Sequence, residues 1–392
     1  MKFFKNLRLT FGGLMLAALA ACGGGSGGSV AESGTLRLAL TDAPSCGYDK
    51  VNITVEKVRV HQSSNANDSD AGWAEVVLNP ARRIDLLNLQ NGILDELGQV
   101  PLPTGKYTQL RMILADNTGS NPPANSVVLT GTVSPATEVA LKTPSGQQSG
   151  VKANINIDIA ANKLADFVID FDACKSVVVA SNSGQYLLKP VVRVTPRYIS
   201  AVAGFVSTQI SGSTTVSVQQ NGVVIKATAP DSNGKFLLQP VAPGLYTLVL
   251  TAPGRATSVI TSVSVVTDTV ALLNTAASAL SLSTTSQLGT VTGTITPTST
   301  PTLVLALQTL TAGPIIEVAG GSFVGSYSYA LPVAAPQVAP YVAPLGLLNF
   351  TPDDTAAGKY TLRASQDGKP TQTAVLGTLT GGATITTNFT FP

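Results

Sequence analysis

Residues 154–171 read NINIDIAANKLADFVIDF, and this stretch decides the fold class of the region around it. Isoleucine alternates with asparagine or aspartate as far as Ile159, and after a short turn Phe167, Ile169 and Phe171 alternate with aspartate and valine. Strict alternation of apolar and polar residues is typical of a β-strand with one buried face. We therefore predict an antiparallel hairpin whose isoleucines and phenylalanines face a core.

The other face of this predicted hairpin is polar. It would carry Asn154, Asn156, Asp158, Asp166, Asp170 and Asp172, with Val168 among them. Carboxylate and amide oxygens suit hard cations, so Asp158, Asp170 and Asp172 could form a calcium site or bind sugar hydroxyls. Since no loop has the aspartate spacing of an EF-hand, we favour a solvated face and assign no metal site.

Similar patterns precede the hairpin. Leu36, Leu38 and Leu40 alternate with polar or small residues, and a second alternation from Val51 to Val60 changes phase after Val55, which indicates a β-bulge. Further strands are predicted at 73–78, 106–114, 127–133 and 138–141. One helix is expected at 85–97, where leucines and isoleucine recur at helical spacing, although Gly92 weakens it.

The remainder of the chain is also rich in strand and turn signals. Asn221-Gly222 lies between two valine-rich runs and predicts a type I′ hairpin. Residues 331–344 carry a proline at every fourth position, which predicts an extended insert rather than a central strand. A final strand is predicted at 384–391.

A Gly-x-Tyr-Thr signature occurs three times, around Tyr107, Tyr246 and Tyr360. A glycine turn followed by a strand whose tyrosine packs at the edge of a sandwich, as in a tyrosine corner, would explain it. A ligand-stacking role for the three rings is the alternative.

The composition agrees with an extracytoplasmic β protein. Only 12% of the residues are charged, against about 25% in typical proteins. The net charge of +2 depends on Lys2, Lys5 and Arg8, and without that segment the charge becomes −1. The basic balance therefore gives no support for nucleic acid as a partner.

The first 21 residues form a predicted signal peptide. The three basic residues precede an apolar run, Leu9 to Ala18, that is too short to span a bilayer. Leu19-Ala20-Ala21-Cys22 then resembles the lipobox of bacterial lipoproteins. The resemblance implies cleavage before Cys22 and acylation of its thiol and amine, with palmitate-type chains as the anchor. An ordinary secretory signal ending at Ala21 is the alternative.

Several expectations follow from the lipobox. Gly23 stands where an aspartate usually retains such proteins in the inner membrane, so the resemblance implies the outer membrane, with the periplasmic or surface face undecided. Residues 22–34 would be a flexible Gly/Ser tether. With Cys22 acylated, Cys46 and Cys174 remain as an even pair and are predicted to form a disulfide in an oxidising compartment. Two separate buried thiols are the alternative.

The region 35–198 resembles a known bacterial family. The motif LTDAP at 40–44, the alternating valines up to His61, LPTGKYTQLR at 102–111 and Lys189-Pro190 together look like domain of unknown function 4382. Members of that family are often lipoproteins. No catalytic residues are established for the family, so the resemblance implies none here.

Residues 199–275 resemble the carboxypeptidase-regulatory-like domain. Gly204-Phe205-Val206, Asn233-Gly234 and the run from Pro243 to Leu250 carry the likeness. It implies a small transthyretin-like β-sandwich of the carbohydrate-binding-like class. After a linker at 276–288, residues 289–392 look like a divergent copy. The expected fold is thus mainly β: an N-terminal β-sandwich-like domain with one short helix, then two transthyretin/Ig-like β-sandwiches in tandem, giving three sandwiches in a row.

The sequence shows no enzyme signature. His61 is the only histidine, and the motifs of serine hydrolases, zinc sites, phosphate loops and dinucleotide-binding folds are absent. We predict no cofactor and no catalysis. The expected function is a membrane-anchored envelope lipoprotein that displays β-sandwiches for binding, adhesion or structure, with the bilayer and a glycan or envelope protein as partners. A carbohydrate-binding accessory protein, using the carboxypeptidase-regulatory-like domain, is the alternative.

Overall fold

The computed structural model describes residues 32–392 except 43–46, 120, 132–136, 144–148, 181–183, 199, 312 and 344. The predicted signal peptide, Cys22 and Cys46 therefore lie outside the described residues. The described part is mainly β, which confirms the predicted fold class, and α1 (Ala173–Ser176) is its one α-helix. No helix in the described part is long and apolar enough to span a bilayer.

The first domain contains two sheets that share one hydrophobic core. The smaller sheet has the order β12-β9-β1-β4, and its strands are β1 (Ser33–Asp42), β4 (Asp95–Pro103), β9 (Leu164–Phe171) and β12 (Val192–Pro196). The larger sheet has the order β10-β11-β7-β6-β2-β5-β8, with β3 paired to β2. Its strands are β2 (Tyr48–His61), β3 (Ala74–Asp85), β5 (Gly105–Leu114), β6 (Ser126–Leu129), β7 (Val139–Lys142), β8 (Val151–Ile159), β10 (Val177–Ala180) and β11 (Gln185–Leu188).

The predicted hairpin at 154–171 is wrong in its pairing and right in its strands. β8 pairs with β5 in the larger sheet, whereas β9 runs parallel to β1 in the smaller one. The turn between them carries the chain from one sheet across to the other, so both apolar faces still meet in the shared core. Val168, expected to face outward, is fully buried, and Asp170 beside it contacts the second domain.

The helix predicted at 85–97 is also wrong. Only Leu86–Leu89 forms a 3-10 turn, capped by the Asp85 carboxylate, and the chain then enters β4 at Asp95. Asn91 and Gly92 both have left-handed φ values, 56° and 76°, which end any helix. Leu86 and Leu89 are buried as the spacing suggested. The predicted bulge in β2 is confirmed by a register shift between Val55 and Lys57.

The second domain contains a three-stranded sheet, β16-β13-β19, and a six-stranded sheet, β15-β14-β17-β18-β24-β25. The first seven strands of the domain are β13 (Ala201–Phe205), β14 (Thr215–Gln220), β15 (Val223–Thr228), β16 (Lys235–Leu238), β17 (Gly244–Thr251), β18 (Ser258–Val265) and β19 (Val270–Leu272). The predicted hairpin at Asn221-Gly222 is confirmed, with φ values of 50° and 70° at the two turn residues.

The third domain is built from two four-stranded sheets. The first has the order β23-β20-β28 with β29 also on β20, and the second has the order β22-β21-β26-β27. The strands are β20 (Leu288–Thr296), β21 (Thr302–Thr309), β22 (Ile315–Phe323), β23 (Ser326–Pro332), β26 (Thr361–Ser365), β27 (Gln372–Val375), β28 (Thr384–Thr386) and β29 (Phe389–Thr390). The proline-rich segment leaves this domain and supplies β24 (Gln337–Pro340) and β25 (Thr351–Pro352) to the second domain's sheet.

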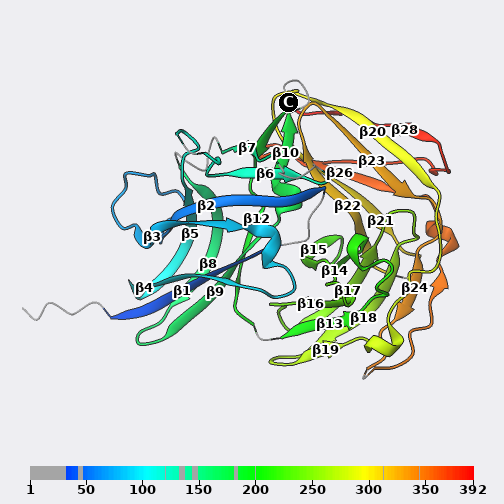
Figure 1. Cartoon of the computed structure of the whole chain (residues 1–392), viewed down its shortest axis with the longest axis horizontal. Helices are drawn as coiled ribbons and strands as arrows, with labels where there is room; N and C mark the ends of the chain where they lie inside the picture. Colours follow the sequence, from blue (N-terminus) through cyan, green and yellow to red (C-terminus); the bar gives the residue numbers. More distant parts are fainter. Residues whose placement is uncertain are drawn as a thin grey trace, which may run out of the picture.

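The three domains are not arranged in a row. In Figure 1 the first domain lies on one side and the other two lie together on the other, with β22 facing the first domain. β22 contacts α1 and β10 of the first domain as well as β14, β15 and β17 of the second. A bridge between Ala180 and Val324 further joins the first and third domains. The expectation of a linear series is therefore corrected by contacts of β22 with both other domains.

Candidate functional site

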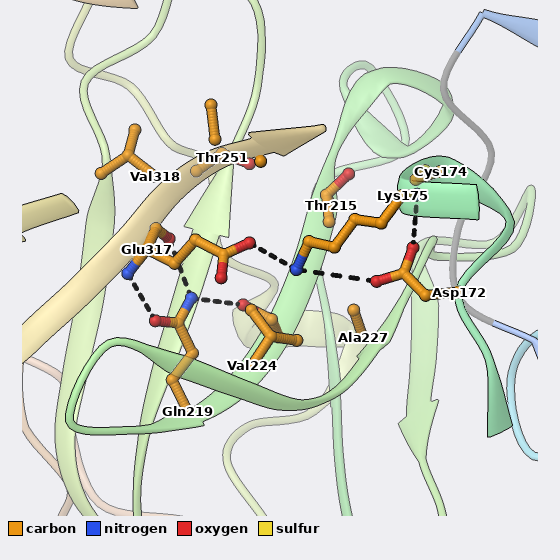
Figure 2. Close-up of a pocket in the computed structure, with 13 residues that line it drawn as sticks. Asp172, Cys174, Lys175, Thr215, Gln219, Val224, Ala227, Thr251, Glu317 and Val318 are labelled. Carbon is orange, nitrogen blue, oxygen red and sulfur yellow. Dashed lines mark hydrogen bonds and ion pairs between the residues drawn. The ribbon is translucent and has the colours of Figure 1, made fainter. Parts of the chain in front are cut away.

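The three domains meet around a cavity of about 200 Å³. Its walls come from α1 of the first domain, β14, β15 and β17 of the second, and β22 of the third. Figure 2 shows that polar side chains from each domain point toward one another here. We call the set Asp172, Lys175, Ser217, Gln219 and Glu317 the junction.

Lys175 is placed at the junction by the short helix α1. The Asp172 carboxylate caps this helix by accepting the Lys175 backbone N–H at 3.0 Å. The Lys175 Nζ lies 2.6 Å from Glu317 Oε1 and 3.6 Å from Asp172 Oδ2. Gly320 leaves room for this side chain, since a Cβ at that position would lie 2.9 Å from Lys175 Cε. The ion pair thus joins the first domain to the third.

Gln219 joins the second domain to the third. Its Nε2 donates to the Glu317 carbonyl and to Ser217 Oγ, both at 2.9 Å, while its Oε1 accepts the Glu317 backbone N–H at 2.7 Å (Figure 2). The β14–β15 pairing shifts register between Val218 and Gln219. The amide therefore bonds both backbone groups of Glu317, and Gln219 is only 1% exposed.

Burial and charge oppose one another at the junction. Burial raises the pKa of Glu317, and the nearby Lys175 charge only partly offsets that effect. Burial by itself lowers the pKa of Lys175, but the charges of Glu317 and Asp172 outweigh it, and the Lys175 pKa is raised. Each charge therefore depends on its partner from the other domain, because a lone buried charge is costly.

A second ion pair lies beside the junction, around a smaller cavity of about 110 Å³. Lys226 of β15 donates to Asp170 of β9 at 2.8 Å, and it also approaches the Thr41 hydroxyl and the Asp42 carbonyl at 3.4 Å. The Asp42 carboxyl is fully buried, and its Oδ1 accepts the Ala173 N–H at 3.0 Å. Burial raises the pKa of Asp42 well above its usual value.

These groups stabilise an interface and show none of the arrangements used in catalysis. The two lysines are held by carboxylates, and no hydroxyl at the junction has a histidine as a base. Within the described ranges, no group of three or more histidine, cysteine or acidic side chains could hold a metal ion. The arrangement can hold three domains in a fixed orientation, and its polar groups are used for that purpose.

The aspartates proposed as a calcium site are separated. Asp158 lies exposed on β8 of the larger sheet, whereas Asp170 and Asp172 point to the junction, where Lys226 and Lys175 pair with them. The solvated polar face is confirmed for β8 only. Cys174 lines the junction cavity. Cys22 and Cys46 lie outside the described residues, so the anchor and the disulfide remain predictions.

The three signature tyrosines are buried, with exposed fractions of 2–5%. The hydroxyls of Tyr107 and Tyr246 donate to carbonyls four residues upstream, Pro103 and Ala242, as the tyrosine-corner interpretation predicts. Tyr360 donates to Pro332 instead. Buried rings cannot stack on a ligand, so that alternative is wrong.

His61 is held by the adjacent loop. Its Nδ1 accepts the Ser63 N–H at 2.8 Å, and its Nε2 lies 3.0 Å from the Ala71 carbonyl. Trp73 stacks between the guanidinium groups of Arg59 and Arg111 next to it. Both ring nitrogens of the histidine are thus engaged in positioning the loop.

Sequence reasoning missed Lys175, Gln219 and Glu317. Glu317 gave one signal, since it is the only charged residue in the apolar run IIEVA at 315–319. A charge in such a run needs a buried partner, but the partner is 142 positions away in the sequence and only the fold identifies it.

Comparison with known families and structures gives a limited result. Residues 33–190 match the family described as Domain of unknown function (DUF4382). This supports the resemblance found in the first domain. The likeness of the second domain to the carboxypeptidase-regulatory-like family has no such support and remains a prediction. No relative was found among curated proteins.

Three solved structures illustrate the likeness at the level of fold. A type II cohesin-X-dockerin complex from Acetivibrio cellulolyticus is 28% identical over 21% of this chain and 56% of its own, with a TM-score of 0.18. The Bacillus anthracis TIE protein is 11% identical over 92% and 51%, with a TM-score of 0.19. The Corynebacterium diphtheriae major pilin SpaA is 10% identical over 91% and 99%, with a TM-score of 0.18. The chain thus spans about half the length of the first two, and we base no conclusion on scores this low.

Proposed function

We propose that this chain is a lipid-anchored bacterial envelope protein that presents three locked β domains for binding, adhesion or envelope structure, without catalysis. The observation that carries the proposal is the junction. Its buried polar groups pair across the three domains at 2.6–2.9 Å and are thereby used for rigidity. A rigid unit on a flexible tether suits display at a membrane surface.

The anchor rests on the lipobox at Leu19-Ala20-Ala21-Cys22 and the glycine-rich tether after it. Two or three acyl chains on Cys22 would give durable attachment, since one chain alone binds a bilayer only marginally. Gly23 supports an outer-membrane destination. The first described strand begins at Ser33, shortly after the tether.

Membrane fractionation tests the anchor. The wild-type chain is expected to stay in the membrane pellet after a high-salt wash and to incorporate labelled palmitate. Cys22→Ser should appear in the soluble fraction without label, while Ser26→Ala in the tether behaves as wild type. A Cys22→Ser protein that remains in the washed membranes would contradict the proposal.

We also propose the Cys46–Cys174 disulfide. Asp42 accepts a hydrogen bond from Ala173, so the chain leading to Cys46 lies beside the residue before Cys174. A bond between them would close a long loop in the unfolded state, and such a bond typically contributes about 2–4 kcal/mol.

Peptide mapping without reductant tests this pairing. The linked peptides containing Cys46 and Cys174 should be recovered from protein exported to the periplasm and should separate on reduction. Replacing both cysteines by serine should lower the free energy of unfolding by about 2–5 kcal/mol. Recovery of both cysteines as free thiols from the exported protein would rule the bond out.

A further inference from the structure

A second cleft, separate from the junction cavity, lies between the first and third domains. Residues 149–152 and 189–191 form one wall, and residues 301, 303, 322 and 365–367 form the other. Its volume is about 420 Å³, within the range of about 300–1,000 Å³ found for small-ligand sites. Clefts between domains are frequent binding sites.

The first-domain wall carries two lysines. Lys152 projects from β8, and Lys189, part of the Lys189-Pro190 motif, follows β11 with its N–H bonded to the Ser176 carbonyl at 2.7 Å. In the part of the chain that the structure describes, neither ammonium has a carboxylate within ion-pair distance. Lys152 is also paired in register with Arg111, which adds a third positive charge to this part of the sheet. This wall therefore favours an anion.

The third-domain wall carries hydrogen-bonding groups without positive charge. Ser322, Ser365 and Asp367 line it, and the buried Gln366 is held in place by its bond to the Thr302 hydroxyl at 2.8 Å. Hydroxyls donate and accept, and a carboxylate accepts, so this wall suits a ligand with several hydroxyl groups. Carboxylates there would repel an anion, so the negative end of a ligand belongs at the lysines.

The residues lining the cleft include no aromatic ring. A neutral sugar would therefore lack the stacking surface that usually supplies its affinity, and recognition must depend on charge. We propose that this cleft binds an anionic saccharide unit, a sugar ring carrying a carboxylate or a phosphate. Lys152 and Lys189 bind the anionic group, while Ser322, Ser365 and Asp367 bind ring hydroxyls.

The cleft exists only when the domains are docked. Ser322 lies on β22, the strand that also carries Glu317, so the Lys175–Glu317 ion pair sets the distance between the two walls. This proposal is independent of the anchor at Cys22, since it needs only the docked domains.

Ligand-observed saturation-transfer NMR on the full chain in a non-ionic detergent tests it. The probes are galacturonate, glucose 6-phosphate, glucose and inorganic phosphate. We expect saturable binding of at least one acidic sugar at millimolar concentrations or below, weakening with salt because the contacts are charged. Binding of galacturonate alone identifies a carboxylate ligand, and binding of glucose 6-phosphate alone identifies a phosphorylated one.

Matched variants place the ligand. The double variant Lys152→Gln/Lys189→Gln should lower the affinity at least about tenfold, since charge-assisted hydrogen bonds to the anion are lost. Lys142→Gln on β7, an exposed lysine outside the cleft, should leave it unchanged. Asp367→Asn should weaken the sugar more than inorganic phosphate. Circular dichroism confirms folding of each variant.

Three results would overturn the proposal. Neither acidic sugar binds at millimolar concentrations, or the double variant binds as tightly as wild type, or inorganic phosphate binds as tightly as the sugar phosphate. The last result would show an anion site without sugar recognition.

Discussion

At the scale of single residues, buried ionisable groups set the behaviour of this protein. Asp42 is fully buried near Asp170, Asp172 and Lys226, and burial raises its pKa well above its usual value. Glu317 shifts in the same direction for the same reason. Both carboxyls hold a proton in the folded state at pH values where the unfolded chain has released it.

The stability of the first domain should therefore fall as pH rises. Between the unfolded pKa of Asp42, about 3.8, and its raised folded pKa, the folded state binds more protons, so the free energy of unfolding decreases with pH. Asp42→Asn carries no titratable group and should flatten this decline. Urea unfolding from pH 4 to 7, followed by the fluorescence of the single tryptophan Trp73, measures it.

Asp49→Asn is the matched control, since Asp49 is exposed on β2 and its removal should leave the wild-type pH dependence. Equal slopes for wild type and Asp42→Asn would show that Asp42 is ionised in the folded state.

At the scale of elements, the sequence predicted what depends on neighbours along the chain. The alternation in β8, the bulge in β2 and the turn at Asn221-Gly222 all follow from local chemistry. The pairing of β8 and β9 could not be predicted, because a short turn can return a chain to the same sheet or send it to the facing one. Glu317 shows the same limit for the site, since its charge is visible and its partner is not.

The Gly-x-Tyr-Thr turns allow a test at this scale. Gly358 has φ +63°, and an added Cβ would lie 2.3 Å from the Leu379 carbonyl oxygen. Gly358→Ala should therefore cost more than the roughly 1–2 kcal/mol expected for a left-handed alanine alone. Calorimetry of the full chain measures the loss in stability of the third domain.

Gly368→Ala is the control for this loss. Gly368 has φ +71° and open space around it, so only the backbone term applies. If the two variants lose equal stability, the close approach to Leu379 is not the reason for glycine at 358.

At the scale of the whole molecule, the junction converts three cores into one unit. The cores lie at 36–188, 202–282 and 291–391, and each could in principle move separately. The Lys175–Glu317 pair, the Gln219 amide and the Lys226–Asp170 pair cross between them. The strand β24, provided by the third domain's sequence to the second domain's sheet, adds a continuous backbone link.

Removing one charge of the junction should loosen the unit. Lys175→Met leaves Glu317 buried without its cation, which costs about 3–5 kcal/mol. Lys175→Met/Glu317→Gln removes both charges and should recover most of that loss. Lys57→Met, which breaks a partly exposed pair with Glu75, should cost no more than about 1 kcal/mol. Thermal unfolding measures all three.

An equal loss for Lys175→Met and Lys57→Met would mean that the junction pair is solvated and holds nothing together. Failure of the double variant to recover would assign the loss to packing of the lysine stem.

Small-angle X-ray scattering of the Cys22→Ser chain in solution tests the docked arrangement most directly. For a compact chain of this length the radius of gyration should be about 21 Å, unchanged between low and high salt because the ion pairs are buried. A markedly larger radius, with a maximum dimension matching three domains end to end, would contradict the locked unit and the cleft that depends on it.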